Sequence, residues 1–544
     1  MNLYAPTLFD EKTLTWRGGS NCPHVFDPKM SIGKAALFVL NQNLDFVAQI
    51  SDNSGVKKTN REIRDSMLKI AVNLTKIGCT KGDVVGFLST NTDELAGAVL
   101  ATFLLAAPVN PLDPSAGKAD IIHMFGLTRP KFIFCEDNKL PILVEALESL
   151  NHKAQIVVLG ERIKAYHHID DFLVDPGNLN ENDFPDVDAE TFAFILCSSG
   201  TTGMPKGVCI SHRTLLYFAA YGIGIDTHKP QSIFCFSSLY WYTGVLTLLM
   251  GTMMGLTRII TNKPYNQDLL YQIIVKHRPN IMFVVSMHIF GILKHPLVTK
   301  STMDSIRYLL FTGTTLSEET WMKIKVYLPN GYFNCGYGMT EMGWVAHEPK
   351  DAAYPSVGNI LSGTEMKILD KEGKKLGIGQ QGELCMKWEH RFLYYYKDPE
   401  RTAELVDKDG WIHSGDTAYF DSNNYLHIVG RSKDIINYEH VHIAPIELEN
   451  LIMSLPGVQE VVAVGIPHPT IEDLHFPAAV LIRHEGASVT EKDIEVIIEK
   501  NLADSKRLRG GVYFVNSFPR TPSGKIKRNL VTEIATKLYK EKNP

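Results

Sequence analysis

The stretch CSSGTTGMPKGV, residues 197–208, directly follows the apolar run TFAFIL at 191–196. The apolar run predicts a buried strand. The small and hydroxyl residues after it predict a loop whose backbone N–H groups point toward an anion, and Lys206 adds a positive charge, so the loop suits a polyphosphate. It differs from a Walker A loop, because Pro205 precedes the lysine and Gly207 follows it in place of Ser or Thr. A flexible linker is the alternative, but a linker needs neither a preceding strand nor a closing lysine.

Strand and helix patterns alternate before this loop. A helix is expected from Thr59 or Asn60, either of which can cap it, to Gly78. Further strands are expected at 83–88, 131–136 and 154–160, and further helices at 92–106 and 140–150. This alternation predicts crossover connections, a largely parallel sheet and ligands at the carboxyl ends of its strands. The sequence therefore predicts an α/β protein whose large N-terminal domain, residues 1–430, has mixed, largely parallel sheets and flanking helices.

The pattern changes after residue 430, where GRSKDIINYEH is polar and charged. The expected elements that follow are a helix near 445–454, strands at 461–466 and 477–482, and a helix near 491–502. They predict a small α+β C-terminal domain, residues 431–544, joined to the first domain at 430–434.

The composition is that of a soluble globular protein of more than one domain, with 544 residues, 44% apolar and 21% charged. The net charge of −5 and the absence of a basic tract argue against a nucleic-acid partner. Eight scattered cysteines without CxxC pairs indicate reduced, mostly buried thiols. No secretory signal, membrane-spanning run or Ser-Lys-Leu-type peroxisomal tail is visible, so the cytoplasm is the expected compartment, with a peroxisomal location left open.

The segment NCGYGMTE, residues 334–341, places Tyr337 between two glycines and ends in Thr340 and Glu341. Glycines permit a tight turn that leaves the aromatic face open for stacking on a purine. Glu341 then suits Mg²⁺ held against phosphate oxygens. A glycine hairpin with an exposed glutamate is an equally supported interpretation of these residues alone.

Three later segments offer polar side chains in loops. WIHSGDTA, residues 411–418, carries Asp416, whose carboxylate can accept both hydroxyls of a ribose, although capping of a turn is the commoner role. Arg431 in GRSKD is either a second ribose contact or a linker charge. PRTPSGKIKR, residues 519–528, carries Lys525 beside a glycine, and a surface hairpin is the alternative there. We interpret His440 and His442 as surface or packing residues in preference to a metal site.

These five segments, in this order and spacing, resemble the adenylate-forming enzymes, the acyl-CoA synthetase, 4-coumarate–CoA ligase and beetle luciferase branch. The resemblance runs from about residue 50 to residue 530. It implies that a carboxylic acid, expected to be a fatty acid, is activated with ATP to an acyl adenylate and transferred to CoA, with Mg²⁺ as cofactor. It also implies that the small domain rotates about a hinge at Lys433.

The resemblance assigns roles to particular residues. Lys525, Glu341 and Thr340 would act at the reacting phosphate, with Glu341 also positioning Mg²⁺. The ATP-binding set would comprise Ser198, Ser199, Gly200, Thr201, Thr202, Gly203, Lys206, Tyr337, Asp416 and Arg431. The acid pocket would comprise Trp241, Tyr242, Gly313, Thr314 and Trp344.

The sequence departs from the family pattern in two places. Asn437 and His440 stand where the family has a lysine and a glycine, so the thioester step is in question. Trp241 replaces the histidine that luciferases use, which disfavours an oxygenase. Two tryptophans near the acid also make a medium-chain or aromatic acid as suitable as a long-chain one. A luciferase-type oxygenase and a catalytically weakened nucleotide- or acyl-binding protein remain alternatives to the ligase.

Overall fold

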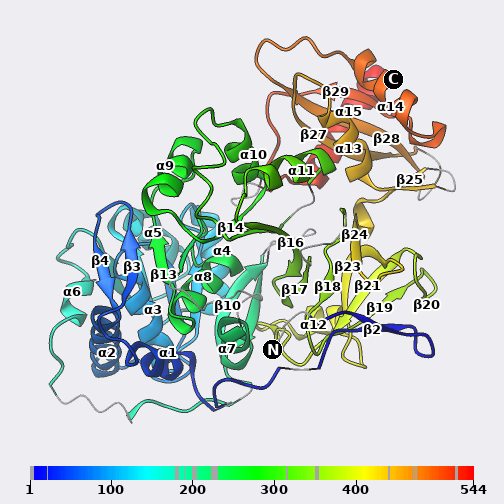
Figure 1. Ribbon diagram of the computed structural model, residues 1–544. Helices are drawn as coiled ribbons and strands as arrows, with labels where there is room; N and C mark the ends of the chain where they lie inside the picture. Colours follow the sequence, from blue (N-terminus) through cyan, green and yellow to red (C-terminus); the bar gives the residue numbers. More distant parts are fainter. Residues whose placement is uncertain are drawn as a thin grey trace.

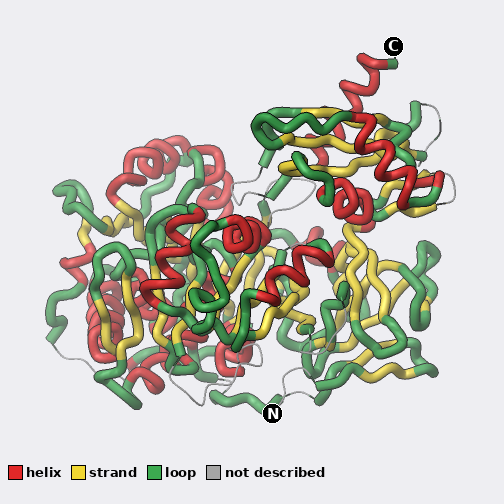
Figure 2. The backbone as a smooth tube through the Cα atoms, turned by 45° about the horizontal axis from the view of Figure 1, so that its top comes forward, coloured by secondary structure: helices red, strands yellow, loops and turns green. Residues whose placement is uncertain are grey.

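The computed structural model describes residues 5–543 except a set of short internal segments. These segments are 21, 28, 178–182, 189, 199–204, 222–230, 314–315, 349–353, 439–440, 470, 472–473 and 521–524. Figure 1 shows a large N-terminal part built on three sheets, and above it a smaller C-terminal part that ends in a helix. Figure 2 shows the same arrangement turned by 45°, with the C-terminal part standing apart from the N-terminal layers.

The first sheet, which we call the β14 sheet, is parallel except at its edges. Its order is β18 (Asn359–Ile360), β17 (Gly343–His347), β16 (Tyr332–Met339), β15 (Tyr308–Phe311), β14 (Ile281–Val284), β12 (Ser232–Phe234), β13 (Thr257–Ile260), β3 (Val47–Ser51) and β4 (Lys57–Thr59). The antiparallel edges are β18–β17–β16 at one side and β4 at the other.

The second sheet, the β5 sheet, is also mainly parallel and carries the candidate phosphate loop. Its order is β22 (Tyr394–Tyr395), β11 (Lys206–Ser211), β10 (Phe192–Ser198), β6 (Val109–Leu112), β5 (Val85–Leu88), β7 (Phe132–Glu136), β8 (Gln155–Leu159) and β9 (His167–His168). β10 and β11 are antiparallel, so the candidate phosphate loop connects two neighbouring strands.

Helices form three layers around these two sheets. The layer between the sheets contains α1 (Ile32–Leu40), α2 (Asn60–Lys76), α3 (Leu95–Leu104), α7 (His212–Tyr221) and α8 (Tyr242–Met253). The outer face of the β5 sheet packs on α4 (Lys118–Thr128) and α5 (Leu140–Ser149), and that of the β14 sheet on α9 (Gln267–His277), α10 (Ser286–Lys294) and α11 (Glu318–Val326). α6 (Ile169–Phe172) and α12 (Pro399–Leu405) are short connecting helices.

The third sheet, the β23 sheet, is antiparallel throughout its described pairings. Its order is β1 (Leu8–Asp10), β2 (Thr15–Arg17), β19 (Glu365–Leu369), β21 (Gly382–Lys387), β23 (Ile412–Phe420) and β24 (Leu426–Arg431), with β20 (Lys375–Leu376) on β19. The sequence prediction did not anticipate this sheet. Its N-terminal hairpin joins strands that lie some 350 residues later in the chain, and local patterns do not report such pairings.

The C-terminal part has its own sheets and its own apolar clusters. The strands are β25 (Ile436–Tyr438) with β26 (Val441–Ile443), and β27 (Val458–Pro467), β28 (His475–Arg483) and β29 (Gly511–Phe514). The helices are α13 (Pro445–Met453), α14 (Glu491–Asn501) and α15 (Arg528–Lys542). This confirms the predicted α+β module, in which β29 and α15 are elements that were not predicted.

The predicted elements of the N-terminal part are confirmed with ends shifted by a few residues. Thr59 caps α2 through a capping box with Glu62, as its sequence position indicates. The apolar run that begins at Leu95 forms the fully buried helix α3. Within the described residues no helix is long and apolar enough to cross a bilayer. All eight cysteines are described; they are free thiols and seven are buried.

Candidate active site

A cleft of about 2750 Å³ opens where the carboxyl ends of the two parallel sheets face the C-terminal part. This is where ligands sit in open α/β sheets. Residues that immediately follow β5, β6, β7, β12, β14 and β15 contribute to its wall. The predicted site residues that line the cleft are Ser198, Lys206, Trp241, Tyr242, Gly313, Thr340, Glu341, Trp344, Arg431 and Lys525.

The ends of the candidate phosphate loop are fixed by the β10–β11 pairing. Ser198 lies opposite Lys206 in that register, so both loop ends meet at the cleft wall. His123 on α4 contacts the Pro205 carbonyl oxygen at 2.7 Å and holds the second end. The predicted phosphate contacts Ser199, Gly200, Thr201, Thr202 and Gly203 lie outside the described residues, as does Thr314 of the acid pocket.

Glu341 lies in the turn between β16 and β17 and is buried, with 7% of its surface exposed. The alternative interpretation, a hairpin with an exposed glutamate, is therefore wrong about the exposure of Glu341. Tyr395 of β22 donates a hydrogen bond to Glu341 Oε1 at 2.7 Å, and the backbone N–H of Phe392 donates to the Glu341 carbonyl at 2.7 Å. An oriented carboxylate that lines the cleft is the type of oxygen ligand that Mg²⁺ accepts, so the site fits this ion.

Tyr337, Asp416 and Arg431 form one polar cluster. The Tyr337 hydroxyl donates to Asp416 Oδ2, and Arg431 Nε lies 3.0 Å from Asp416 Oδ1. Burial raises the pKa of Asp416 above its usual value, and the charge of Arg431 and the hydrogen bond from Tyr337 oppose that rise. Tyr337 and Asp416 themselves stand outside the cleft lining, and Arg431 connects them to it.

Two predictions about the backbone of this cluster are wrong. Asp416 lies inside β23, opposite Arg431 of β24, and not in a loop. Tyr337 lies inside β16, and the turn begins only after Met339. These positions follow from cross-strand pairing, which outweighs the local turn preference of glycine.

The glycines beside Tyr337 are needed for close packing. A Cβ atom at Gly336 would lie 1.9 Å from the ring of Trp344, and a Cβ atom at Gly338 would lie 2.2 Å from the Gly343 carbonyl oxygen. Only glycine permits this approach of β16 to β17. Gly336 and Gly338, which in the sequence suggested an open aromatic face for a purine, therefore allow Trp344 to pack against β16.

The predicted acid pocket is an aromatic part of the cleft wall. Trp344 is 4% exposed and packs edge-on against Phe283 of β14, with ring centroids 5.9 Å apart. Tyr242 and Trp241 stand at the start of α8, and both line the cleft. Gly313 also lines the cleft, with φ of +100° and open space where a Cβ would stand.

Lys525 reaches the cleft from the C-terminal part. Ion pairs of Arg520 with Glu460 and of Arg528 with Glu449 hold the segment on both sides. Desolvation of the ammonium, and then the charge of Arg431, lower the pKa of Lys525.

The predicted hinge residue Lys433 lies in the short 3-10 turn Ser432–Asp434. Asn437 follows in β25, opposite His442, while His440 lies outside the described residues.

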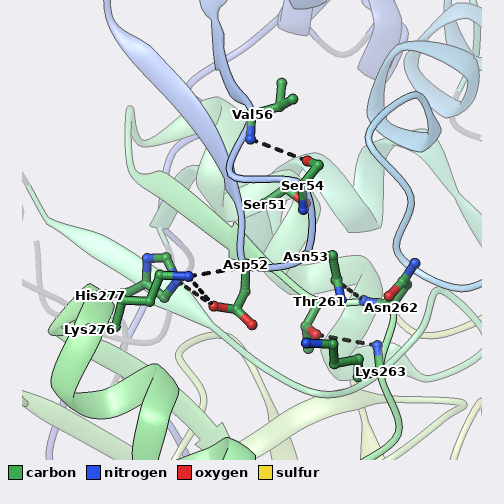
Figure 3. A network of polar contacts seen from close by, with 10 residues as sticks. All are labelled: Ser51, Asp52, Asn53, Ser54, Val56, Thr261, Asn262, Lys263, Lys276 and His277. Atoms are coloured by element: carbon green, nitrogen blue, oxygen red, sulfur yellow. Dashed lines mark hydrogen bonds and ion pairs between the residues drawn. The ribbon is translucent and has the colours of Figure 1, made fainter.

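A polar network fixes another wall of the cleft (Figure 3). The turn after β3 places Asp52 2.8 Å from Lys276 Nζ and 2.9 Å from His277 Nε2 of α9. In the same turn Asn53 accepts a hydrogen bond from the backbone N–H of Asn262 at 2.7 Å. Asn262 and the residues after it line the cleft, so a turn near residue 52 supports a wall some 210 residues later in the chain.

The register of the β23 sheet also gathers Glu383, Cys385 and His413, a set that linear spacing does not reveal. His413 Nδ1 lies 3.0 Å from Glu383 Oε2, and His413 Nε2 lies 3.6 Å from Asp407 Oδ2. Both ring nitrogens therefore have carboxylate partners, and we interpret the set as a hydrogen-bonded support of β23.

Two residues that the sequence did not single out are Tyr395, which lines the cleft, and Glu348, a buried carboxyl group. Tyr395 stands in the aromatic run LYYYKDPE, which carries no recognisable chemical pattern. Glu348 follows β17 and is 2% exposed, and burial raises its pKa to about 7.

A family model described as AMP-binding enzyme matches residues 39–396. This chain belongs to that family. A second model, described as AMP-binding enzyme C-terminal domain, matches residues 447–525. The family membership confirms the resemblance that the five sequence segments indicated.

Three similar proteins cover between 76% and 94% of this chain. The 4-coumarate–CoA ligase 4 of Arabidopsis thaliana is 28% identical over 493 residues, which is 86% of this chain and 85% of that protein. The luciferase-like enzyme from the nonluminescent Zophobas morio mealworm is 27% identical, with a TM-score of 0.70 over 76% of this chain and 98% of its own. ATP-bound MatB from Rhodopseudomonas palustris has a TM-score of 0.82 over 94% of this chain and 100% of its own, and at 23% identity it shares the fold.

Proposed function

We propose that this AMP-binding enzyme is an acid–thiol ligase, which activates a carboxylic acid with ATP and transfers the acyl group to CoA. One observation carries the proposal: a single cleft joins a polar end that contains Lys206, Glu341 and Lys525 to an aromatic wall. The polar end suits a polyphosphate and the aromatic wall suits the body of an apolar acid.

In the first step, a carboxylate oxygen of the acid attacks the α-phosphorus of ATP. The bond to the pyrophosphate oxygen breaks, and pyrophosphate leaves. Lys206 and Ser198, at the two ends of the phosphate loop, would hold the polyphosphate, and Thr340 would contact the α-phosphate. Lys525 would neutralise charge as it develops on the transferred group.

The Tyr337–Asp416–Arg431 cluster would hold the nucleoside. Arg431 lines the cleft and pairs with Asp416, so Arg431 would contact the ribose in an orientation that Asp416 fixes. Glu341 would hold Mg²⁺, whose charge would offset that of the triphosphate.

In the second step, the CoA thiol displaces AMP from the acyl adenylate. We propose that residues 431–544 move as a unit about Lys433 between the two steps, because Lys525 must leave room for the thiol. Separate apolar clusters in the C-terminal part support such a rigid movement.

For the acid, we favour an aromatic substrate over the fatty acid that the sequence suggested. Trp241, Tyr242 and Trp344 line the cleft, and relatives across the length of the chain carry the name 4-coumarate–CoA ligase. A fatty acid of medium chain length is the competing candidate.

The test measures acid-dependent pyrophosphate release from Mg-ATP with cinnamate-type, medium-chain, long-chain and short acids, each with and without CoA. Release together with thioester formation for one acid class supports the ligase and identifies its substrate. Release that stops at the adenylate would mean that the thioester step is lost. Light emission would indicate an oxygenase, and ATP binding without release under any condition would rule out the ligase.

A further inference from the structure

Tyr395 contacts two residues of the proposed phosphate site at once. Its hydroxyl donates to Glu341 Oε1 at 2.7 Å, and the ammonium of Lys206 lies 4.6 Å from the centre of its ring. One side chain thus touches both the lysine at the end of the phosphate loop and the carboxylate of the β16–β17 turn. Tyr395 is 4% exposed and lines the cleft.

The backbone makes this arrangement rigid. β22 pairs with β11 so that Tyr395 lies opposite Val208, two residues after Lys206. The Tyr395 N–H donates to the Thr402 hydroxyl at 3.0 Å. Three residues earlier, the N–H of Phe392 donates to the Glu341 carbonyl, so the segment 392–395 holds the Glu341 turn through backbone and side chain.

We propose that Tyr395 is a positioning residue that orients the Glu341 carboxylate toward a divalent cation and the Lys206 ammonium toward the polyphosphate. The inference rests on the proposed function of the cleft. The two parts of the side chain have separate tasks, because the hydroxyl holds the Glu341 carboxylate and the ring face holds the Lys206 ammonium.

The chemistry of the phenol suits this task. A phenol hydroxyl is a hydrogen-bond donor at neutral pH, and here it donates to the Glu341 carboxylate. With its hydrogen bond made, one carboxylate oxygen is fixed on the protein side and the orientation of the group toward the cleft is set. A carboxylate that must first be ordered would bind the cation more weakly.

The two tasks can be separated by substitution. Tyr395→Phe keeps the ring beside Lys206 and removes the hydrogen bond to Glu341, whereas Tyr395→Leu removes both. Tyr394→Phe is the matched control, because Tyr394 is the neighbouring residue on the same strand, is 37% exposed, and lies opposite Cys209. Thermal unfolding of each variant establishes that the fold is retained.

The experiment measures calorimetric binding of a non-hydrolysable ATP analogue to the full chain over a Mg²⁺ titration. Tyr395→Phe is expected to raise the Mg²⁺ concentration needed for half-maximal binding roughly ten-fold, as for a lost hydrogen bond to a charged group. Its binding without Mg²⁺ should equal that of the wild type. Tyr395→Leu should in addition weaken binding without Mg²⁺, because Lys206 loses its ring contact.

A second comparison tests whether Tyr395 acts through Glu341. In the Glu341→Gln background, Tyr395→Phe should change the Mg²⁺ dependence by much less than in the wild type, since the carboxylate it orients is gone. Equal Mg²⁺ dependence of Tyr395→Phe, Tyr394→Phe and the wild type would overturn the inference, as would equal effects in the two backgrounds. A wild type that shows no Mg²⁺-dependent nucleotide binding would instead refute the proposed function itself.

Discussion

At the scale of single residues, Asp416 shows how charge is placed in this protein. The residue is 6% exposed, and its carboxylate contacts Arg431 from the neighbouring strand and Tyr337 from a different sheet. Both contacts favour the ionised carboxylate over the neutral acid. Removal of the charge would leave Arg431 without its anion and alter the surface offered to a nucleoside.

Asp416→Asn should therefore lower kcat/KM for ATP by roughly 10- to 100-fold, which corresponds to about 1.4–2.7 kcal/mol for a lost charged hydrogen-bond partner. The measurement is pyrophosphate release at varied ATP, with Asp409→Asn as an exposed control. An unchanged kcat/KM would show that the cluster has no part in nucleotide binding.

Glu348 provides a prediction about stability. Burial raises its pKa to about 7, whereas an unfolded glutamate titrates near 4.5. The folded state binds the extra proton between these values, so this residue lowers stability as pH rises from about 4.5 to about 7.

Glu348→Gln, which can still accept the hydrogen bond from the Cys335 N–H, should stabilise the protein at pH 8. We expect the free energy of unfolding at pH 8 to rise by roughly 1–3 kcal/mol, and this gain should vanish near pH 4.5. Urea unfolding at the two pH values measures it, and the exposed Glu404→Gln is the control. A gain that does not depend on pH would contradict the assignment of the raised pKa.

At the scale of elements, the segment around Lys525 shows how a charge is delivered to a site from another part of the chain. Arg528 begins α15 and bonds to Glu449 at 2.7 Å, so the segment is anchored to the C-terminal core next to the lysine. Lys525 itself projects into the cleft. This separation of anchor and functional group allows the lysine to be tested without loss of the fold.

Lys525→Met should slow adenylate formation by about 100- to 1000-fold, as expected for loss of one preorganised charge in the transition state. Binding of ATP should change little, because the lysine acts as the charge develops. Single-turnover pyrophosphate release and nucleotide binding measure the two effects, and Lys527→Met is the neighbouring control. Equal losses in binding and rate would point to a ground-state role.

At the scale of the whole molecule, the cleft depends on segments that are far apart in sequence. The turn after β3 is joined to α9 through Asp52 and to the cleft wall through the hydrogen bond between Asn262 and Asn53 (Figure 3). Burial raises the pKa of Asp52, but the hydrogen bonds from Lys276 and His277 outweigh it, so the pKa is lowered overall.

A lowered pKa means that Asp52 stabilises the fold above the pKa of the unfolded residue, and that this contribution is lost as pH falls through the folded value. Asp52→Asn should lower the free energy of unfolding by roughly 1–2 kcal/mol at pH 7. The difference in this free energy between the variant and the wild type should shrink below pH 4. Urea unfolding tests this. Asp45→Asn, which removes an exposed pair with Arg61, should have almost no effect.

Much of the fold could be predicted from the sequence because its signals are local. Periodic apolar residues and the Thr59 cap gave α2, and apolar runs gave β5, β7, β8 and β10. The β23 sheet, and the strand positions of Tyr337 and Asp416, could not be predicted, because they depend on pairing between segments that are distant in the chain.

The sequence by itself determined the family, the order of the elements before the phosphate loop and the chemical type of most candidate site residues, since these depend on residue identity and short-range spacing. Only the tertiary structure brought Asp416 to Arg431 and Tyr337, buried Glu341, and placed Tyr395 between Glu341 and Lys206. Those contacts join separate strands and sheets, and their geometry is set by strand register and packing, which no local stretch of sequence specifies.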